Sequence, residues 1–100
     1  MCRNQIKSMV KENLDEVISW RRHFHEFPEL SFEEFETSKF IAEKLNKMGF
    51  EVKNNVGGTG VIATFDSGIG GPNIAFRADM DALPILEDTG LEFESKNPGV

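Results

Sequence analysis

The amino-acid sequence predicts a layered α/β or α+β unit in which two helices precede three closely connected strands. Two segments of helical hydrophobic spacing come first, at residues 4–26 and 31–48. Three short apolar runs follow at residues 50–53, 61–65 and 73–78, with glycine-rich turns between them. The composition of 39% hydrophobic residues, including nine phenylalanines and one tryptophan, is sufficient for a core. We therefore do not expect a disordered chain.

The first segment has an apolar stripe between charged residues, as an amphipathic helix does. The stripe consists of Ile6, Val10, Leu14, Val17, Ile18 and Phe24. Pro28 disfavours the helical conformation at Phe27, so the helix is predicted to end near residue 26.

The second segment has a sharper start signal. Ser31 and Glu34 have the spacing of a capping box, in which the Ser31 hydroxyl accepts from the Glu34 amide and the Glu34 side chain returns the bond. Gly49 suits the left-handed position that closes a helix. The predicted buried stripe is Phe35, Ile41, Ala42, Leu45 and Met48.

The three apolar runs differ in their expected burial. Residues 50–53 alternate apolar and polar side chains, as an edge strand does. Residues 61–65 are apolar enough to be covered on both faces. Residues 73–78 are predicted as the third strand, and Pro84 prevents further ladder pairing beyond it.

Net charge and hydropathy exclude several classes of partner. The formal charge of −6 argues against nucleic acid or an anionic membrane as a partner. No apolar run approaches the ~20 residues that a membrane span needs. The opening residues 1–7 contain no apolar signal core, so we expect a cytoplasmic protein.

Two carboxylates, Asp79 and Asp81, directly follow the third apolar run. Acidic side chains at the carboxyl end of a buried strand can bind a ligand or orient another group, but they can also simply cap a turn. A phosphoryl-transfer site of the haloacid-dehalogenase type is an alternative, since Asp79-Met80-Asp81 matches its D-x-D-x-[TV] pattern. Against this alternative, Leu83 replaces the expected Thr or Val, and Arg77 interrupts the strand.

Three other segments favour structural roles. Cys2, the single cysteine, has no fixed His or Cys neighbour that would make it a ligand or nucleophile. His23 and His25 lie two apart on a helix and point in different directions, so they cannot share a metal, and His25 is expected to cap or pack. Residues 57–60 (GGTG) precede a strand, whereas a phosphate site needs a helix N-terminus there.

Three motifs in order resemble a known family: residues 21–34 (RRHFHEFPELSFEE), 58–61 (GTGV) and 77–84 (RADMDALP). They resemble the opening of the metal-dependent amidohydrolases, which include hippurate hydrolases, N-acyl-amino-acid amidohydrolases (aminoacylases) and plant auxin-conjugate hydrolases. The resemblance runs from about Asp15 to Val100. It implies an α/β fold in which the two helices and three strands open a layered, mixed-sheet, zinc-peptidase-like catalytic domain.

The resemblance also implies a chemistry, which is hydrolysis of an N-acyl amino acid by a water that two zinc or manganese ions activate. The metal ligands of the family follow in a His-Ala-Cys-Gly-His-Asp motif and later, so none is expected within residues 1–100, and this chain alone is expected to hold no metal. Asp81 matches the aspartate that orients a metal ligand. Asp79 and Arg77 are expected to support that arrangement.

On this resemblance, residues 1–100 form the N-terminal part of a metallopeptidase-like catalytic domain, without the separate lid and dimerisation domain. The parent enzyme is expected to be a homodimer or homo-oligomer. A different class of function also remains open. In that case the chain is a truncated product that acts only as a structural or interaction piece. A His-Ala-Cys-Gly-His-Asp continuation after Val100 would distinguish the two.

Overall fold

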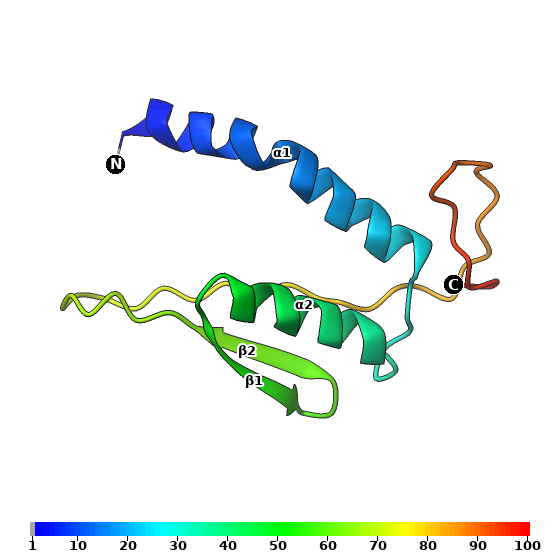
Figure 1. Ribbon diagram of the computed structural model, residues 1–100. Helices are drawn as coiled ribbons and strands as arrows, with labels where there is room; N and C mark the ends of the chain where they lie inside the picture. Colours follow the sequence, from blue (N-terminus) through cyan, green and yellow to red (C-terminus); the bar gives the residue numbers. More distant parts are fainter. Residues whose placement is uncertain (1) are drawn as a thin grey trace.

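The computed structural model describes residues 2–100. Two helices and a hairpin follow one another along the chain: α1 (Arg3–Glu26), α2 (Phe35–Lys47), β1 (Glu51–Val56) and β2 (Gly60–Thr64) (Figure 1). This order agrees with the predicted α/β class, in which two helices precede the strands. Within the described residues, however, the sheet has two strands where three were predicted.

Helix α1 ends where Pro28 was predicted to end it. Phe27 leaves the helical region with φ −121° and ψ 63°, and its amide donates to the His23 carbonyl at 3.0 Å. The N-terminal half of α1 stands clear of the hairpin (Figure 1). The predicted apolar stripe is exposed on that half, at Ile6, Val10 and Leu14, and it stays exposed on the next turn, at Val17 and Ile18.

An aromatic cluster joins the last turns of α1 to α2. The ring of His23 stacks on that of Phe40, with centroids 4.3 Å apart, and Phe24 meets Phe40 edge-on at 5.2 Å. Such pairs stabilise beyond the apolar area that they bury. His23 therefore has a packing role, and the contact fixes the C-terminal end of α1 relative to α2.

The predicted capping box of α2 is wrong. The helix begins at Phe35, with Glu34 as the N-cap residue and no side-chain bond from it to the helix. Phe32 has a positive φ of 65° and reverses the chain, so Ser31 lies one turn too early to cap. Glu34 instead accepts a hydrogen bond from the Thr59 hydroxyl at 2.5 Å. The predicted closing position is confirmed, because Gly49 has a φ of +94°.

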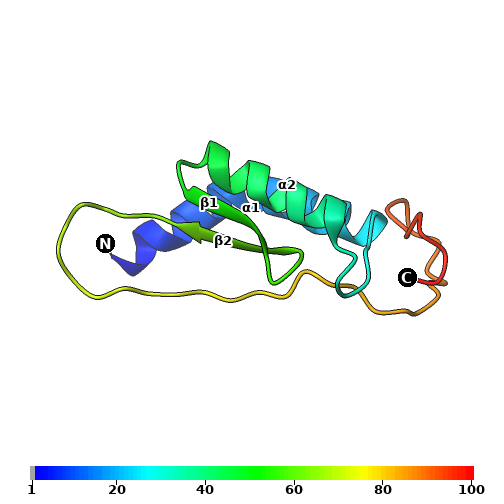
Figure 2. The same ribbon diagram turned by 90° about the horizontal axis from the view of Figure 1, so that it is seen from below.

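Strands β1 and β2 pair antiparallel, with Glu51 opposite Thr64 and Lys53 opposite Ile62. Figure 2 shows α2 lying over one face of this hairpin. The opposite face is uncovered, and Ile62 of β2 is exposed. The expectation that residues 61–65 are covered on both faces is therefore wrong for this chain.

The predicted third strand, residues 73–78, is extended but belongs to no sheet. A strand forms only when its backbone groups find a partner ladder, and β2 has no second neighbour among residues 2–100. The first pairing comes later, where Ala82 forms an isolated parallel bridge with Leu30 and its amide donates to the Glu29 carbonyl at 2.8 Å. This contact anchors the end of the extended segment beside the α1–α2 connection.

The molecule is less compact than a finished domain of its length. Its radius of gyration is 16.1 Å, whereas a compact chain of this size has about 13 Å. The extended segment accounts for part of this difference, because it runs along the hairpin without joining it (Figure 2).

Candidate functional site

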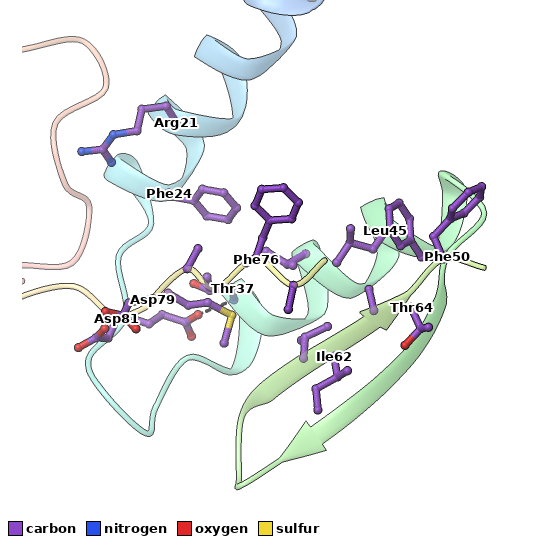
Figure 3. A pocket seen from close by; sticks show the side chains of 18 of the residues that line it. Arg21, Phe24, Thr37, Leu45, Phe50, Ile62, Thr64, Phe76, Asp79 and Asp81 are labelled. Carbon is purple, nitrogen blue, oxygen red and sulfur yellow. Dashed lines mark hydrogen bonds between the residues drawn. The ribbon is translucent and has the colours of Figure 1, made fainter. Parts of the chain in front are cut away.

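A long groove separates β2 from the extended segment and reaches the C-terminal end of α1 (Figure 3). Its volume is about 1690 Å³. Most of its lining is apolar and includes Phe24, Ile41, Leu45, Phe50, Ile62 and Phe76. Asp79 and Asp81 lie together at one end of the groove (Figure 3). The sequence-derived site residues thus stand at the margin of an apolar surface.

Of the predicted site residues, Arg77 and Asp79 contact each other. The Arg77 Nη2 lies 2.9 Å from the Asp79 Oδ1, and the two side chains are 88% and 68% exposed. Ion pairs this exposed contribute ~0–1 kcal/mol, because water and salt screen them. Asp81 is also exposed, and it immediately precedes the bridge at Ala82. The bridge therefore fixes the backbone next to Asp81 better than the backbone next to Asp79.

The described residues do not fit a metal site by themselves. No group of three or more His, Cys, Asp or Glu side chains within residues 2–100 could hold a metal ion. A structural or catalytic site uses about three or four protein ligands, and Asp79 with Asp81 supplies two carboxylates. These oxygens are suited to orienting a ligand from another part of a protein.

A second polar cluster, centred on Glu87, was missed by sequence reasoning. Glu87 Oε1 lies 2.8 Å from His25 Nε2 and accepts the Ser95 amide at 2.9 Å, while its Oε2 accepts the Thr89 hydroxyl. The Thr89 hydroxyl, the His25 ring and the Ser95 amide lower the pKa of Glu87 to about 2. The residues of the pair are 62 positions apart, so no local pattern could have revealed it.

The remaining segments singled out in the sequence have structural positions. Gly57 and Gly58, with φ of +64° and +112°, form the tight turn between β1 and β2, so no helix follows them. His23 and His25 contact different partners, as their spacing predicted. Cys2 is exposed at the start of α1. Among the described residues, neither helix is long and apolar enough to cross a membrane.

The fold is that of the opening of a metallopeptidase-type catalytic domain. The chain superposes with a TM-score of 0.91 on a protein described as an aminohydrolase from methicillin-resistant Staphylococcus aureus, at 48% identity over 98% of this chain and 26% of that one. It also superposes on YxeP of Bacillus subtilis, a dinuclear metal-binding peptidase of the M20 family, with a TM-score of 0.80. That match has 47% identity over 89% of this chain and 25% of that one.

Curated relatives give the same result. Thermostable carboxypeptidase 1 of Saccharolobus solfataricus is 48% identical over 97 residues, which are 96% of this chain and 25% of the relative. N-acyl-L-amino acid amidohydrolase of Geobacillus stearothermophilus is 46% identical over 100 residues, all of this chain and 27% of the relative. Hippurate hydrolase of Campylobacter jejuni is 42% identical over 96 residues, 93% of this chain and 25% of the relative. No family model matches the chain.

The chain belongs to the M20 family of amidohydrolases and peptidases and corresponds to its N-terminal portion. It spans about a quarter of the length of these relatives. The resemblance drawn from the three sequence motifs is therefore confirmed.

Proposed function

We propose that this chain is the N-terminal part of the catalytic domain of a metal-dependent enzyme that hydrolyses the amide bond of N-acyl amino acids. The observation that carries this proposal is the 46% identity, along all 100 residues, to an N-acyl-L-amino acid amidohydrolase. The match to a dinuclear metal-binding peptidase supports two divalent metals in the full-length protein. When bound, such metals activate a water and polarise the acyl carbonyl.

Asp81 is proposed to orient a metal ligand that comes from beyond Val100. A carboxylate does this by accepting the ring N–H of a ligating histidine, which fixes the ring and raises its basicity. Asp81 stands at the margin of the groove, next to the anchored Ala82. Asp79, already paired with Arg77, is proposed to support this arrangement from the more exposed side.

The metals are proposed to be zinc or manganese, and the full-length protein a cytoplasmic homodimer or homo-oligomer. The relatives named for N-acyl-L-amino acids and hippurate support a small acylated amino acid as substrate. The net charge of −6 gives no reason to expect nucleic acid as a partner.

The proposal is tested with the full-length protein on a panel of N-acetyl amino acids and hippurate. We expect release of the free amino acid, loss of activity after chelation, and recovery on addition of zinc or manganese. Absence of amino-acid release from every substrate by the metal-loaded protein would overturn the proposal. It would favour the other interpretation, a structural or interaction role without catalysis.

A further inference from the structure

The segment of residues 85–97 has no regular secondary structure, yet it is tied to the last turn of α1 at several points. The main contact is made by the Glu87 carboxylate, which accepts hydrogen bonds from three groups: the ring of His25 on α1, the hydroxyl of Thr89, and the backbone amide of Ser95. Because an ionised carboxylate only accepts, the His25 Nε2 must donate in this bond. The Glu87 side chain thus connects α1 with two places in the segment, at Thr89 and at Ser95.

A second set of contacts holds the end of the same segment, at Lys96 and Asn97, against the C-terminal end of α1 and the residues after it. Lys96 Nζ lies 2.7 Å from Glu26 Oε1, and the Lys96 amide donates to the Glu26 carbonyl at 2.8 Å. The Asn97 side-chain amide donates to the Pro28 carbonyl at 3.1 Å. The bond from the Lys96 amide satisfies the carbonyl of Glu26, the last residue of α1, which has no partner within the helix. The segment is therefore held to the C-terminal end of α1 and to the residues that directly follow it.

Between the two sets of polar contacts lies the Phe93 ring. It meets the His25 ring edge-on at 5.4 Å, and the Arg22 guanidinium stands 4.7 Å from its centroid. Aromatic and cation–π contacts of this kind add to the ordering of the side chains that make them. Phe93 thus contacts the same His25 ring that Glu87 bonds.

Burial distinguishes this cluster from the Asp79 side of the groove. The Glu87 side chain is 13% exposed, and hydrogen bonds to a charged group are the stronger ones when water is excluded. Glu87 and His25 line the same groove as Asp81, and Val100 lines it as well. The segment that Glu87 holds is the connection between Asp81 and the residue at which the described chain ends.

We propose that Glu87, held by His25, Thr89 and Ser95, is a positioning residue. It fixes the segment of residues 85–97 against α1 and so sets where the chain continues relative to Asp81. This inference rests on the proposed function, in which the residues after Val100 supply the metal ligands that Asp81 orients. A displacement of about 1 Å at such a site can cost ~100-fold in rate.

The test uses four variants of the full-length protein: Glu87→Ala, Glu87→Gln, His25→Leu and His25→Gln. Glu92→Gln is the matched control, because Glu92 is an exposed carboxylate of the same segment. Hydrogen–deuterium exchange of residues 88–97, kcat, KM and bound metal are measured, with circular dichroism for the global fold.

We expect Glu87→Ala and His25→Leu to speed exchange in the segment and to lower kcat or bound metal by about 10–100-fold, with KM little changed. His25→Gln retains an N–H donor near the Nε2 position and should recover most of the loss. Glu92→Gln should match the wild type. A purely structural role would not make the conservative His25→Gln variant recover kcat.

Wild-type kcat and metal content in both Glu87 variants would overturn the inference. So would a loss of activity that occurs only together with the global fold, because a positioning residue acts within a folded domain. Failure of the proposed function gives a different result, in which the wild-type protein itself releases no amino acid. The exchange of residues 88–97 then decides whether Glu87 orders the segment.

Discussion

The Glu29 carboxylate caps α2 by accepting the Thr37 amide at 2.5 Å on Oε1 and the Glu36 amide at 3.1 Å on Oε2. It thereby satisfies two of the first backbone donors of the helix, which have no acceptor within it. Its negative charge is also favourable at a helix N-terminus. Glu29 performs the function that the sequence pattern had assigned to Ser31.

We predict that Glu29→Ala lowers the free energy of unfolding by ~1 kcal/mol, the usual cost of losing a side-chain cap. Urea denaturation of the full-length protein measures this change, and hydrogen exchange at Glu36 and Thr37 localises it. Glu33→Ala is the control, because Glu33 is an exposed carboxylate of the same connection. Equal stabilities of the two variants would contradict a capping role for Glu29.

The Glu87 cluster is predicted to respond to acid. The pKa of Glu87 is lowered from 4.5 to about 2 by the Thr89 hydroxyl, the His25 ring and the Ser95 amide. Since the folded-state pKa lies below the ordinary value, the contacts stabilise the fold above pH 4.5, and this contribution is lost as the pH falls toward about 2.

The measurement for this prediction is the chemical shift of the Ser95 amide, followed by nuclear magnetic resonance from neutral pH downward. We expect its titration to have a midpoint well below 4.5. Glu87→Gln should abolish the titration, and Glu92→Gln should leave it intact. A titration that persists in Glu87→Gln would mean that another group is responsible.

The sequence predicted the elements that depend on near neighbours. Pro28 acts directly on Phe27, and Gly49 supplies the positive φ that ends α2, so both boundaries followed from a few residues. The prediction of a capping box at Ser31 and Glu34 was wrong because it, too, used only a short sequence spacing. The spacing of Ser31 and Glu34 takes no account of the turn at Phe32, which moves the first helical residue beyond the reach of Ser31.

Features that depend on distant residues could not be predicted in the same way. Residues 73–78 have strand character, but a strand also needs a partner, and none is present within residues 2–100. The pair of His25 and Glu87 joins positions 62 apart and leaves no periodic signal. Asp79 and Asp81 could be located at the end of an apolar run, although the role proposed for them depends on residues outside this chain.

For Asp81, we predict that Asp81→Ala in the full-length protein lowers bound metal or turnover by about 10–100-fold and leaves the fold intact. The reason is that an unoriented ligand binds its metal less well. Metal analysis, kcat and circular dichroism together test this. Asp88→Ala, an exposed aspartate of the following segment, is the control. An Asp81→Ala protein with full activity and metal content would show that Asp81 only shapes a turn.

The isolated chain of residues 1–100 is predicted to bind zinc or manganese weakly. Among residues 2–100 no three ligand side chains come together, and two carboxylates give less than the three or four ligands of a tight site. Isothermal titration calorimetry measures the affinity. A tight site with one or two ions per chain would contradict this prediction.

The isolated chain is also predicted to self-associate. Phe76 is 95% exposed and Ile74 is 79% exposed, and they belong to an extended segment with no ladder partner. Exposed apolar side chains and unpaired strand backbone both promote association. The net charge of −6 opposes it only in part, because salt screens repulsion beyond ~8 Å at physiological ionic strength.

Size-exclusion chromatography and binding of a hydrophobic dye test the prediction of self-association, and we expect oligomers that bind the dye. Replacing Ile74 and Phe76 together by Thr should reduce both oligomer formation and dye binding. Val52→Thr should reduce neither, because Val52 is half-buried under α2. A monodisperse wild-type chain that binds no dye would show that these side chains find cover within the chain itself.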